Sequence, residues 1–270
     1  MVRVANCFPP VTTSSELLTP GVPDYPPRLI ALGWTPELHV RGVLSTSPAV
    51  AIVGARAASR LGMDRAHATA RHLAERGVHV VSGGALGIDG AAHRGAIAAG
   101  TTTVVLGSGV DVAYPARHAR LFDQIVQTGG ALVSMMADGA EPRRWSFVAR
   151  NPLIAALADV VVVIEADDRS GSLTTARAAT ELGRLIVAYP GSRGCHQLLR
   201  AGAAIAEAPI DVERALAGEP RMPSAHVDPE IELIRAAHAG GARTIDAIAE
   251  ATGLPVRAVL RGLPLIERYS

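Results

Sequence analysis

The chain has 270 residues, of which 49% are hydrophobic and 19% are charged, and its formal net charge at pH 7 is +1. This composition supplies enough apolar surface for a sizeable core and excludes a chain that is disordered throughout. A nearly neutral chain has no overall attraction for a polyanion, so a nucleic-acid site would have to gather positive charge locally.

The cysteines and the N-terminus indicate the compartment. Only Cys7 and Cys195 occur, without a C-x-x-C pattern, so neither a disulfide framework nor a zinc site is expected. The opening "MVRVANCFPP" lacks the charged start and apolar core of an export signal, and no uncharged apolar run reaches the roughly 18 residues of a membrane span. We therefore expect a cytoplasmic protein that binds no metal and enters no membrane.

Residues 1–48 are rich in proline and carry scattered apolar positions, as in "DYPPRLIAL" and "PELHVRG". This pattern predicts an irregular N-terminal lead-in that contains a helical turn and one strand. We expect it to flank the main domain.

Between residues 49 and 208, short apolar runs alternate with helical stretches. Runs that are apolar almost throughout are typical of strands covered on both faces, and helical spacing lies between them at 62–76, 89–99 and 172–183. The alternation predicts an α/β fold with a doubly wound, mostly parallel sheet. The runs are "AVAIVGA", "HVVSGGALG", "TTVVLGSG", "ALVSMM", "DVVVVIEA" and "RLIVAYPG".

Small and polar residues follow four of these strands. Because the carboxyl ends of parallel strands share one edge of a sheet, we expect these turns to line a single groove for an anion, although glycines also serve tight turns and close packing. Neither G-x-G-x-x-G after the first strand nor G-x-x-x-x-G-K-[ST] occurs, which argues against NAD and ATPase functions. The turn residues are Gly54, Arg56 and Ser59; Ser82, Gly83, Gly84 and Gly87; Gly107, Ser108 and Gly109; and Ser170, Gly171 and Ser172.

The stretch "EPRRWSFVARN" interleaves basic and aromatic residues in a chain with only 3% aromatic residues. Single-stranded DNA requires a groove that contacts phosphates and an apolar or aromatic face for a base. Packing of the two aromatic side chains in the core is the alternative, and both remain open at this point. The residues concerned are Arg143, Arg144, Trp145, Phe147, Arg150 and Asn151.

Two sets of residues, an Asp–His pair and an acidic stretch, allow either a catalytic or metal-binding role or a structural one. Asp89 and His93 are one helical turn apart and could form an acid/base pair, but we expect Asp89 to serve the helix N-terminus and His93 to be structural. The acidic residues of "EADDRSGS" could bind Mg²⁺ with Ser170 and Ser172, yet capping of the next helix is the simpler account. Because no G-x-S-x-G elbow occurs either, we expect no catalytic residue, no cofactor and no metal.

The C-terminal part loses the strand–helix rhythm. Residues 209–229 gain proline and predict a linker after a short helix. Residues 230–270 have the spacing of a helix-turn-helix, with Thr244 as N-cap and Gly253 at the turn. We expect a truncated, winged-helix-like module that serves packing or protein contact, with Arg257 and Arg261 leaving DNA contact open.

Several blocks within residues 25–208 resemble, in order, the DNA-processing protein A family (DprA, also called Smf). The resemblance implies an extended Rossmann-like domain without enzymatic activity. It also implies a homodimer that binds single-stranded DNA, protects it and loads the RecA recombinase during natural transformation. The blocks include "AIVGARAASRLG", "VVSGGALGIDGAAHRGAIAAG", "TTVVLGSGVDVAYPARHARL", "FVARN" and "VVVIEADDRSGSLTTARAATELGR".

By this resemblance, Arg56, Ser59, Phe147, Arg150 and Asn151 fall on phosphate- and base-contacting positions, and Arg143 or Arg144 falls near a further basic position. Two positions depart from the family pattern, because Leu86 and Pro152 stand where arginines are usual. Fewer guanidiniums neutralise fewer phosphates, so DNA binding is expected to be weaker.

A second function remains open at the sequence level. Related Rossmann-like families use glycine-rich turns on nucleoside phosphates. A nucleotide-binding protein, or an N-glycoside hydrolase acting on nucleoside phosphates, is therefore the alternative hypothesis.

Overall fold

The computed structural model describes residues 14–168, 170–223, 233–234, 237–238 and 240–267, and it divides into two compact units, residues 1–222 and 223–270. Cys7 and residues 224–229 of the expected linker lie outside the described residues. Each unit is considered by itself below.

A nine-stranded sheet forms the centre of the first unit, in the order β1-β2-β6-β5-β4-β3-β7-β8-β9. All neighbouring pairs from β6 to β9 along this order are parallel, as predicted for strands that are buried on both faces. The six apolar runs of the sequence correspond to β3–β8, which confirms the doubly wound α/β fold. These strands are β3 (Ala49–Val53), β4 (His79–Gly83), β5 (Thr102–Val105), β6 (Ala131–Ser134), β7 (Val160–Val163) and β8 (Leu185–Ala188), followed by the short β9 (Ala204–Ile205).

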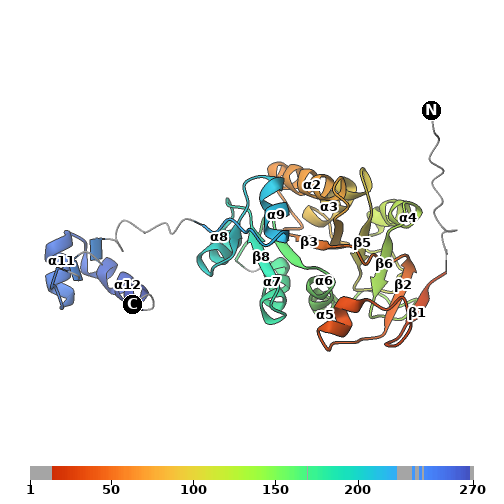
Figure 1. Ribbon diagram of the computed structural model, residues 1–270, viewed down its shortest axis with the longest axis horizontal. Coiled ribbons are helices and arrows are strands. Elements are labelled where there is room, and N and C mark those ends of the chain that lie inside the picture. Colours follow the sequence, from red (N-terminus) through yellow and green to blue (C-terminus); the bar gives the residue numbers. More distant parts are fainter. Residues whose placement is uncertain (1–13, 169, 224–232, 235–236, 239, 268–270) are drawn as a thin grey trace. The chain divides into compact units, whose positions relative to one another are not determined.

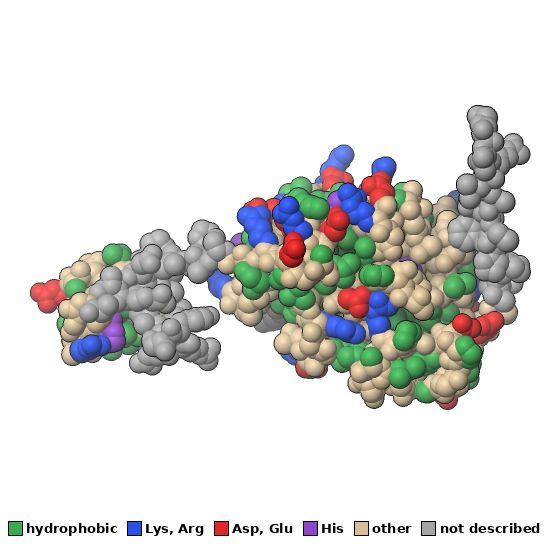
Figure 2. All heavy atoms as spheres, viewed as in Figure 1, with side chains coloured by type: hydrophobic (Ala, Val, Ile, Leu, Met, Phe, Trp, Pro, Cys, Tyr) green, Lys and Arg blue, Asp and Glu red, His purple; other side chains and the backbone are tan. Residues whose placement is uncertain are grey.

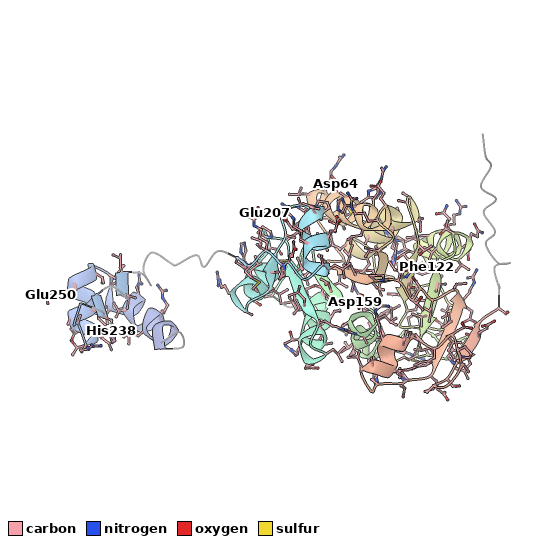
Figure 3. All side chains as sticks on the ribbon, viewed as in Figure 1. Asp64, Phe122, Asp159, Glu207, His238 and Glu250 are labelled. Carbon is pink, nitrogen blue, oxygen red and sulfur yellow. The ribbon has the colours of Figure 1, made fainter. Side chains whose placement is uncertain are left out.

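Helices cover both faces of the sheet (Figure 1). One face carries α2 (Arg60–Ala74), α3 (Ile88–Ile97), α4 (Ala119–Gln127) and α9 (Pro209–Leu216). The other carries α1 (Pro27–Ala31), α6 (Asn151–Ala156), α7 (Gly171–Glu181) and α8 (Arg193–Arg200), whose apolar residues share a core with the sheet. Phe122 of α4, labelled in Figure 3, is buried among residues of β5 and β6.

The N-terminal segment differs from the flank expected of residues 1–48. Its strands β1 (Glu16–Leu18) and β2 (Leu38–Gly42) extend the central sheet, because β2 pairs antiparallel with β6 and β1 pairs antiparallel with β2. Tyr25, Leu29 and Leu38 are buried in the same core as the parallel strands. The segment is therefore part of the α/β unit.

An ion pair ties this segment to the parallel strands. The Nε and Nη2 atoms of Arg28 lie 2.9 and 2.7 Å from the two carboxylate oxygens of Asp159, and the Ala49 N–H donates to Asp159 Oδ2 at 2.8 Å. Burial raises the pKa of Asp159, but the hydrogen bonds from Arg28 and Ala49 outweigh it and hold the pKa below its ordinary value. The charged carboxylate thus stabilises the fold.

We expect Asp159→Asn to lower the free energy of unfolding at neutral pH, because the variant keeps the shape but loses the charge opposite Arg28. Because the pKa of Asp159 is lower in the folded than in the unfolded protein, the carboxylate stabilises the fold fully at pH values above the unfolded-state pKa of about 4. This stabilisation is lost as the pH falls through the lower, folded-state pKa. Urea unfolding of both proteins between pH 7 and 2.5 should therefore show a difference that narrows below about pH 4. A difference that is constant with pH would contradict this account.

The short helix expected at the start of residues 209–229 is present, but it belongs to the first unit and not to a linker. Residues 209–216 form α9, which packs on α2, and Val212 and Ala215 are buried in the core on that face. The apolar residues of "PIDVERAL" are spaced so that one side of the helix packs into the core of the first unit.

The second unit contains α11 (Ile245–Thr252) and α12 (Val256–Glu267), which pack on each other. The Thr244 Oγ1 accepts from the Ala247 N–H at 3.2 Å, and Gly253 ends α11 with φ +69°, as the sequence indicated. Ile234, Ile248 and Val259 form its small core. The part of this unit that the structure describes contains no strand, so no wing is seen there. None of the described helices is long and apolar enough to span a bilayer.

Candidate nucleic-acid interface

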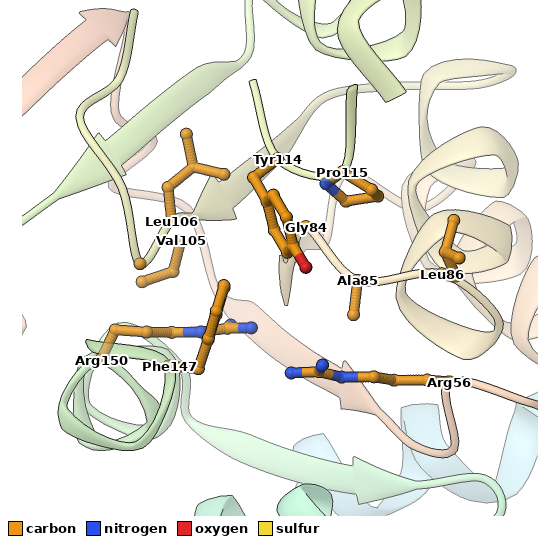
Figure 4. A pocket seen from close by; sticks show the side chains of 11 residues that line it. Arg56, Gly84, Ala85, Leu86, Val105, Leu106, Tyr114, Pro115, Phe147 and Arg150 are labelled. Atoms are coloured by element: carbon orange, nitrogen blue, oxygen red, sulfur yellow. The ribbon is translucent and has the colours of Figure 1, made fainter. Parts of the chain in front are cut away.

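The carboxyl ends of β5, β4, β3 and β7 are neighbours along one edge of the sheet. A pocket of about 80 Å³ opens above β4 and β5, between the loop after β3 and the short helix α5 (Arg144–Ala149) (Figure 4). Of the residues predicted from the sequence, Arg56, Gly84, Gly107, Phe147 and Arg150 line it. The remaining lining residues are Ala85, Leu86, Val105, Leu106, Tyr114 and Pro115.

Two guanidiniums approach the pocket from opposite sides, with the Phe147 ring beside them (Figure 4). Arg56 comes from the loop after β3, and its Cζ lies 5.3 Å from the centroid of the Phe147 ring. The Tyr114 ring is 5.3 Å from the same ring and is 44% exposed. The pocket therefore combines positive charge with an accessible aromatic face.

Arg150 is the more unusual of the two arginines, because its side chain is buried and its Nε and Nη1 atoms have no hydrogen-bond partner. Burial lowers the pKa of its guanidinium, whereas the nearby Asp89 carboxylate opposes that shift. A Cβ at Gly83 would lie 2.0 Å from Nη1, so a residue without a side chain is needed beneath the guanidinium. A buried cation with unsatisfied donors is a natural binding group for an anion.

Asp89 and His93 take the structural roles expected of them. Asp89 lies in the first turn of α3, where its Oδ2 accepts from the Ala85 N–H at 3.3 Å, and burial raises its pKa against the opposing effect of Arg150. His93 is fully buried; its ring nitrogens lie 2.9 Å from Thr102 Oγ1 and from the Gly83 carbonyl oxygen. Burial lowers the pKa of His93 to about 3, so the ring is neutral at physiological pH.

Ser59 corrects the prediction that the N-terminus of α2 holds a phosphate. The Ser59 Oγ caps α2 by accepting from the Gly62 N–H at 3.0 Å and donates to Glu165 Oε2 at 2.6 Å. The Glu165 carboxylate thus occupies the place expected for the anion. Gly54 lies beside it, where a Cβ would come 2.9 Å from the Glu165 carbonyl oxygen.

The other predicted serines also have internal partners. Ser82 Oγ donates to the Ile52 carbonyl at 2.5 Å and Ser108 Oγ donates to the Val112 carbonyl at 2.8 Å, and both side chains are buried. Ser170 caps α7, and its Oγ lies 2.7 Å from the Ser172 Oγ. These serines shape the turns and do not line the pocket.

Asn151 is buried at the start of α6, where its Nδ2 donates to the Gly171 carbonyl at 3.3 Å. This hydrogen bond ties α6 to the first turn of α7. Pro152 stands in the first turn of α6, a position that suits proline, and Leu86 lines the pocket where the resemblance places an arginine.

The arginines of this edge are not neutralised. Arg143 and Arg144 are exposed at the start of α5 next to Trp145, which is 61% exposed. Like Arg56 and Arg150, they form no ion pair with a described acidic side chain. The edge therefore carries a local excess of positive charge in a chain that is nearly neutral overall.

The arginines along α2 and just after it contrast with them, apart from Arg65, which donates to the Pro190 carbonyl and lies over the Tyr189 ring. Arg71 lies 2.8 Å from Glu75, Arg76 lies 2.9 Å from Glu213, and Arg60 lies 3.8 Å from Asp64. Figure 2 shows basic and acidic side chains next to each other over this helix. The basic face of α2 is therefore a solvated, charge-balanced surface.

No cluster of acidic, histidine or cysteine side chains within the described residues could hold a metal ion. Glu165 is engaged with Ser59, and Asp168 accepts a hydrogen bond from Gln197 at 2.9 Å. Two of the three acidic side chains considered for Mg²⁺ thus have other partners.

Tyr114 is the pocket residue that sequence reasoning missed. Its signal was the "VAYP" part of a block shared with the family, in which an aromatic residue precedes a proline shortly after β5. Tyr114 lies farther along the loop than the glycine and serine residues that follow β5 directly, so the pattern at the strand end did not point to it.

We expect Gly87→Ala to lower the free energy of unfolding by about 2–4 kcal/mol, because it combines a disfavoured backbone angle with overpacking. Gly87 has φ +75°, and a Cβ there would lie 2.3 Å from the Ala55 carbonyl oxygen and 2.6 Å from that of Arg56. Urea unfolding measures the loss. Gly171→Ala is the matched control, since its Cβ would meet nothing within 4 Å, and this variant should retain full stability. Equal stability of both variants would contradict the steric role of Gly87.

Comparison with known proteins places the chain in a family. The family model of DNA recombination-mediator protein A matches residues 16–217. The chain belongs to this family. A DNA processing protein DprA of Mycobacterium tuberculosis is 43% identical over 236 residues, which cover 81% of this chain and 60% of that protein. Protein Smf of Escherichia coli is 41% identical over 198 residues, which cover 70% of this chain and 53% of that protein.

Solved structures of DprA proteins share the fold. The X-ray structure of DprA from Streptococcus pneumoniae has a TM-score of 0.69 at 37% identity and covers 74% of each chain. A structure of DprA from Helicobacter pylori, described for its single-stranded DNA binding mode, has a TM-score of 0.68 at 30% identity and covers 77% of this chain and 97% of that one. The chain spans between half and two thirds of the length of the curated DprA and Smf relatives given above.

Proposed function

We propose that this DprA-family protein binds single-stranded DNA across the carboxyl edge of its sheet. The observation that carries the proposal is the pocket in which Arg56 and the buried Arg150, which forms no ion pair, converge beside the exposed Tyr114 and the half-buried Phe147. Guanidiniums suit phosphates, and aromatic faces suit unstacked bases of any sequence. The DNA-binding description of the Helicobacter pylori relative supports the same ligand class.

The size of the pocket favours a nucleic-acid strand that lies across its opening, and it is less suited to enclosing a single nucleotide. Its volume of about 80 Å³ is well below the roughly 300–1,000 Å³ typical of sites that enclose a small molecule. One phosphate or part of one base can enter, and the rest of the ligand extends over the rim, where Arg143, Arg144 and Trp145 are exposed. This geometry suits a polymer.

The alternative, binding or hydrolysis of a nucleoside phosphate, has less support from the same geometry. The buried Asp89 and His93 are held by structural hydrogen bonds, and the pocket is small for a nucleotide. Release of free base from a nucleoside monophosphate, in amounts that rise with protein concentration, would favour this alternative.

Family membership supports the finer parts of the proposal. The protein acts in the cytoplasm as a homodimer without enzymatic activity, protects single-stranded DNA that enters the cell and loads RecA on it during natural transformation. The family model's description as a recombination mediator fits this role. A mediator needs to expose its bound strand to a recombinase, which an open edge site allows.

We expect Arg56→Ala to weaken binding of a labelled oligothymidine about tenfold at low salt, because one charge-assisted phosphate contact is lost. The slope of log K against log salt should fall by about 0.7, the value for one phosphate of a single strand. A salt-titrated gel shift measures both quantities. Arg200→Ala is the control, since this exposed arginine ends α8 and should not affect binding.

Arg150→Met provides a second, independent variant. It removes a buried cation whose Nε and Nη1 have no partner, so DNA affinity should fall, and urea unfolding of the variant shows that it is folded, because the buried Asp89 carboxylate loses the nearby charge. If neither Arg56→Ala nor Arg150→Met changes retardation of the oligonucleotide, the proposed interface is wrong.

We expect the protein, when bound to an oligonucleotide, to crosslink to RecA and to shorten the lag of RecA assembly on that strand. Arg56→Ala should lose both effects in proportion to its loss of DNA binding, because loading requires a bound strand. Light scattering of the free protein should give the mass of two chains. An unchanged lag with wild-type protein at saturating DNA would contradict the loading role.

A further inference from the structure

We propose that Glu165 is the positioning residue for Arg56 and thereby sets the affinity of the edge site for single-stranded DNA. The inference rests on the proposed function, since it concerns how the Arg56 side chain is presented to a strand. Glu165 follows β7, whereas Arg56 follows β3, and the two strands are adjacent and parallel.

Glu165 holds the Arg56 loop at both of its ends. Before Arg56, the Ala55 N–H donates to the Glu165 carbonyl oxygen at 2.7 Å. After it, Ser59 donates to the Glu165 carboxylate through both its main-chain N–H, at 3.1 Å to Oε1, and its Oγ, at 2.6 Å to Oε2. One residue thereby fixes the span of a loop whose only arginine reaches the pocket.

Glycines on either side leave room for this arrangement. A Cβ at Gly62 would lie 2.3 Å from Glu165 Oε2, and a Cβ at Gly54 would lie 2.9 Å from the Glu165 carbonyl oxygen. On the far side of the loop, Gly87 accepts the close approach of the Ala55 and Arg56 carbonyl oxygens. The loop is therefore held between the Glu165 side and the start of α3.

A positioning role and a purely electrostatic role of Glu165 predict opposite changes in DNA affinity when its carboxylate is removed. A carboxylate near a polyanion site repels the ligand, so its removal alone should tighten binding. A carboxylate that holds the arginine loop should, when truncated, weaken binding, because the guanidinium must then be ordered when DNA binds. The sign of the change therefore separates the two.

We expect Glu165→Ala to weaken oligothymidine binding about threefold to tenfold, the effect of ordering one or two side chains on binding. Glu165→Gln, whose amide oxygen can still accept from Ser59, should bind as well as or more tightly than the wild type. In the Arg56→Ala background, Glu165→Ala should have no further weakening effect. The measurement is a fluorescence-anisotropy titration, with urea unfolding of each variant to show that it is folded.

Gly62→Ala tests the same arrangement without changing charge. The added methyl group should displace the Glu165 carboxylate and weaken binding as Glu165→Ala does, although alanine favours the helix more than glycine by about 1 kcal/mol. The two changes combined should be no worse than either alone.

The outcomes separate this inference from the proposed function. If neither Arg56→Ala nor Arg150→Met weakens oligothymidine binding, the proposed function fails. If Arg150→Met weakens binding but Arg56→Ala does not, Arg56 makes no contact that Glu165 could position, and only the present inference is overturned. If Arg56→Ala weakens binding but Glu165→Ala binds as tightly as or more tightly than the wild type, Glu165 only repels the strand and the positioning role is overturned. Weakening by Glu165→Ala that persists in full in the Arg56→Ala background, or that Glu165→Gln does not restore, overturns it as well.

Discussion

Parallel pairing of β3 with both β4 and β7 is the constraint on which the candidate site depends. It brings the loops after three strands to one edge, although Arg56 and Glu165 are far apart in the chain. Doubly wound sheets usually bind ligands at the point where the strand order reverses. In this molecule that point lies between β3 and β7, because β4–β6 were added on one side of β3 and β7–β9 on the other. Here the Glu165 carboxylate and the N-terminus of α2 fill that place, and the pocket lies above β4 and β5 instead.

Charge is distributed in two different ways on the same small domain. Arg71 near the end of α2 and Arg76 just after it lie beside the carboxylates of Glu75 and of Glu213 on α9, so they add little local potential. The arginines of the loop after β3 and of α5 have no such partners among the described residues. A net charge of +1 therefore conceals a patch in which several guanidiniums are available to an anion.

The sequence was sufficient for features that depend on local pattern. Strands β3–β8 follow from apolar runs, and the capping of α7 and α11 by Ser170 and Thr244 follows from residue type, whereas the capping of α2 by Ser59 was not predicted. Arg150 and Phe147 could be joined to the site because basic and aromatic residues alternate there. That Ser59 is engaged by Glu165 could not be foreseen, since their contact spans 106 positions and depends on strand order. The lead-in was misjudged for the same reason, because β2 pairs with a strand far along the chain.

The surroundings of Arg150 give the two pocket arginines different physical characters. Arg56 is exposed and hydrated, so mobile ions screen it and water must leave it when an anion arrives. Arg150 has already lost most of its water during folding, and the cost of that dehydration was met by the packing of the domain. An anion that reaches it meets a desolvated cation, with the Asp89 carboxylate nearby, at low local dielectric, where ionic strength has little influence. The attraction of Arg56 for an anion thus depends on the salt concentration, whereas the attraction of Arg150 at the other end of the pocket depends on it much less.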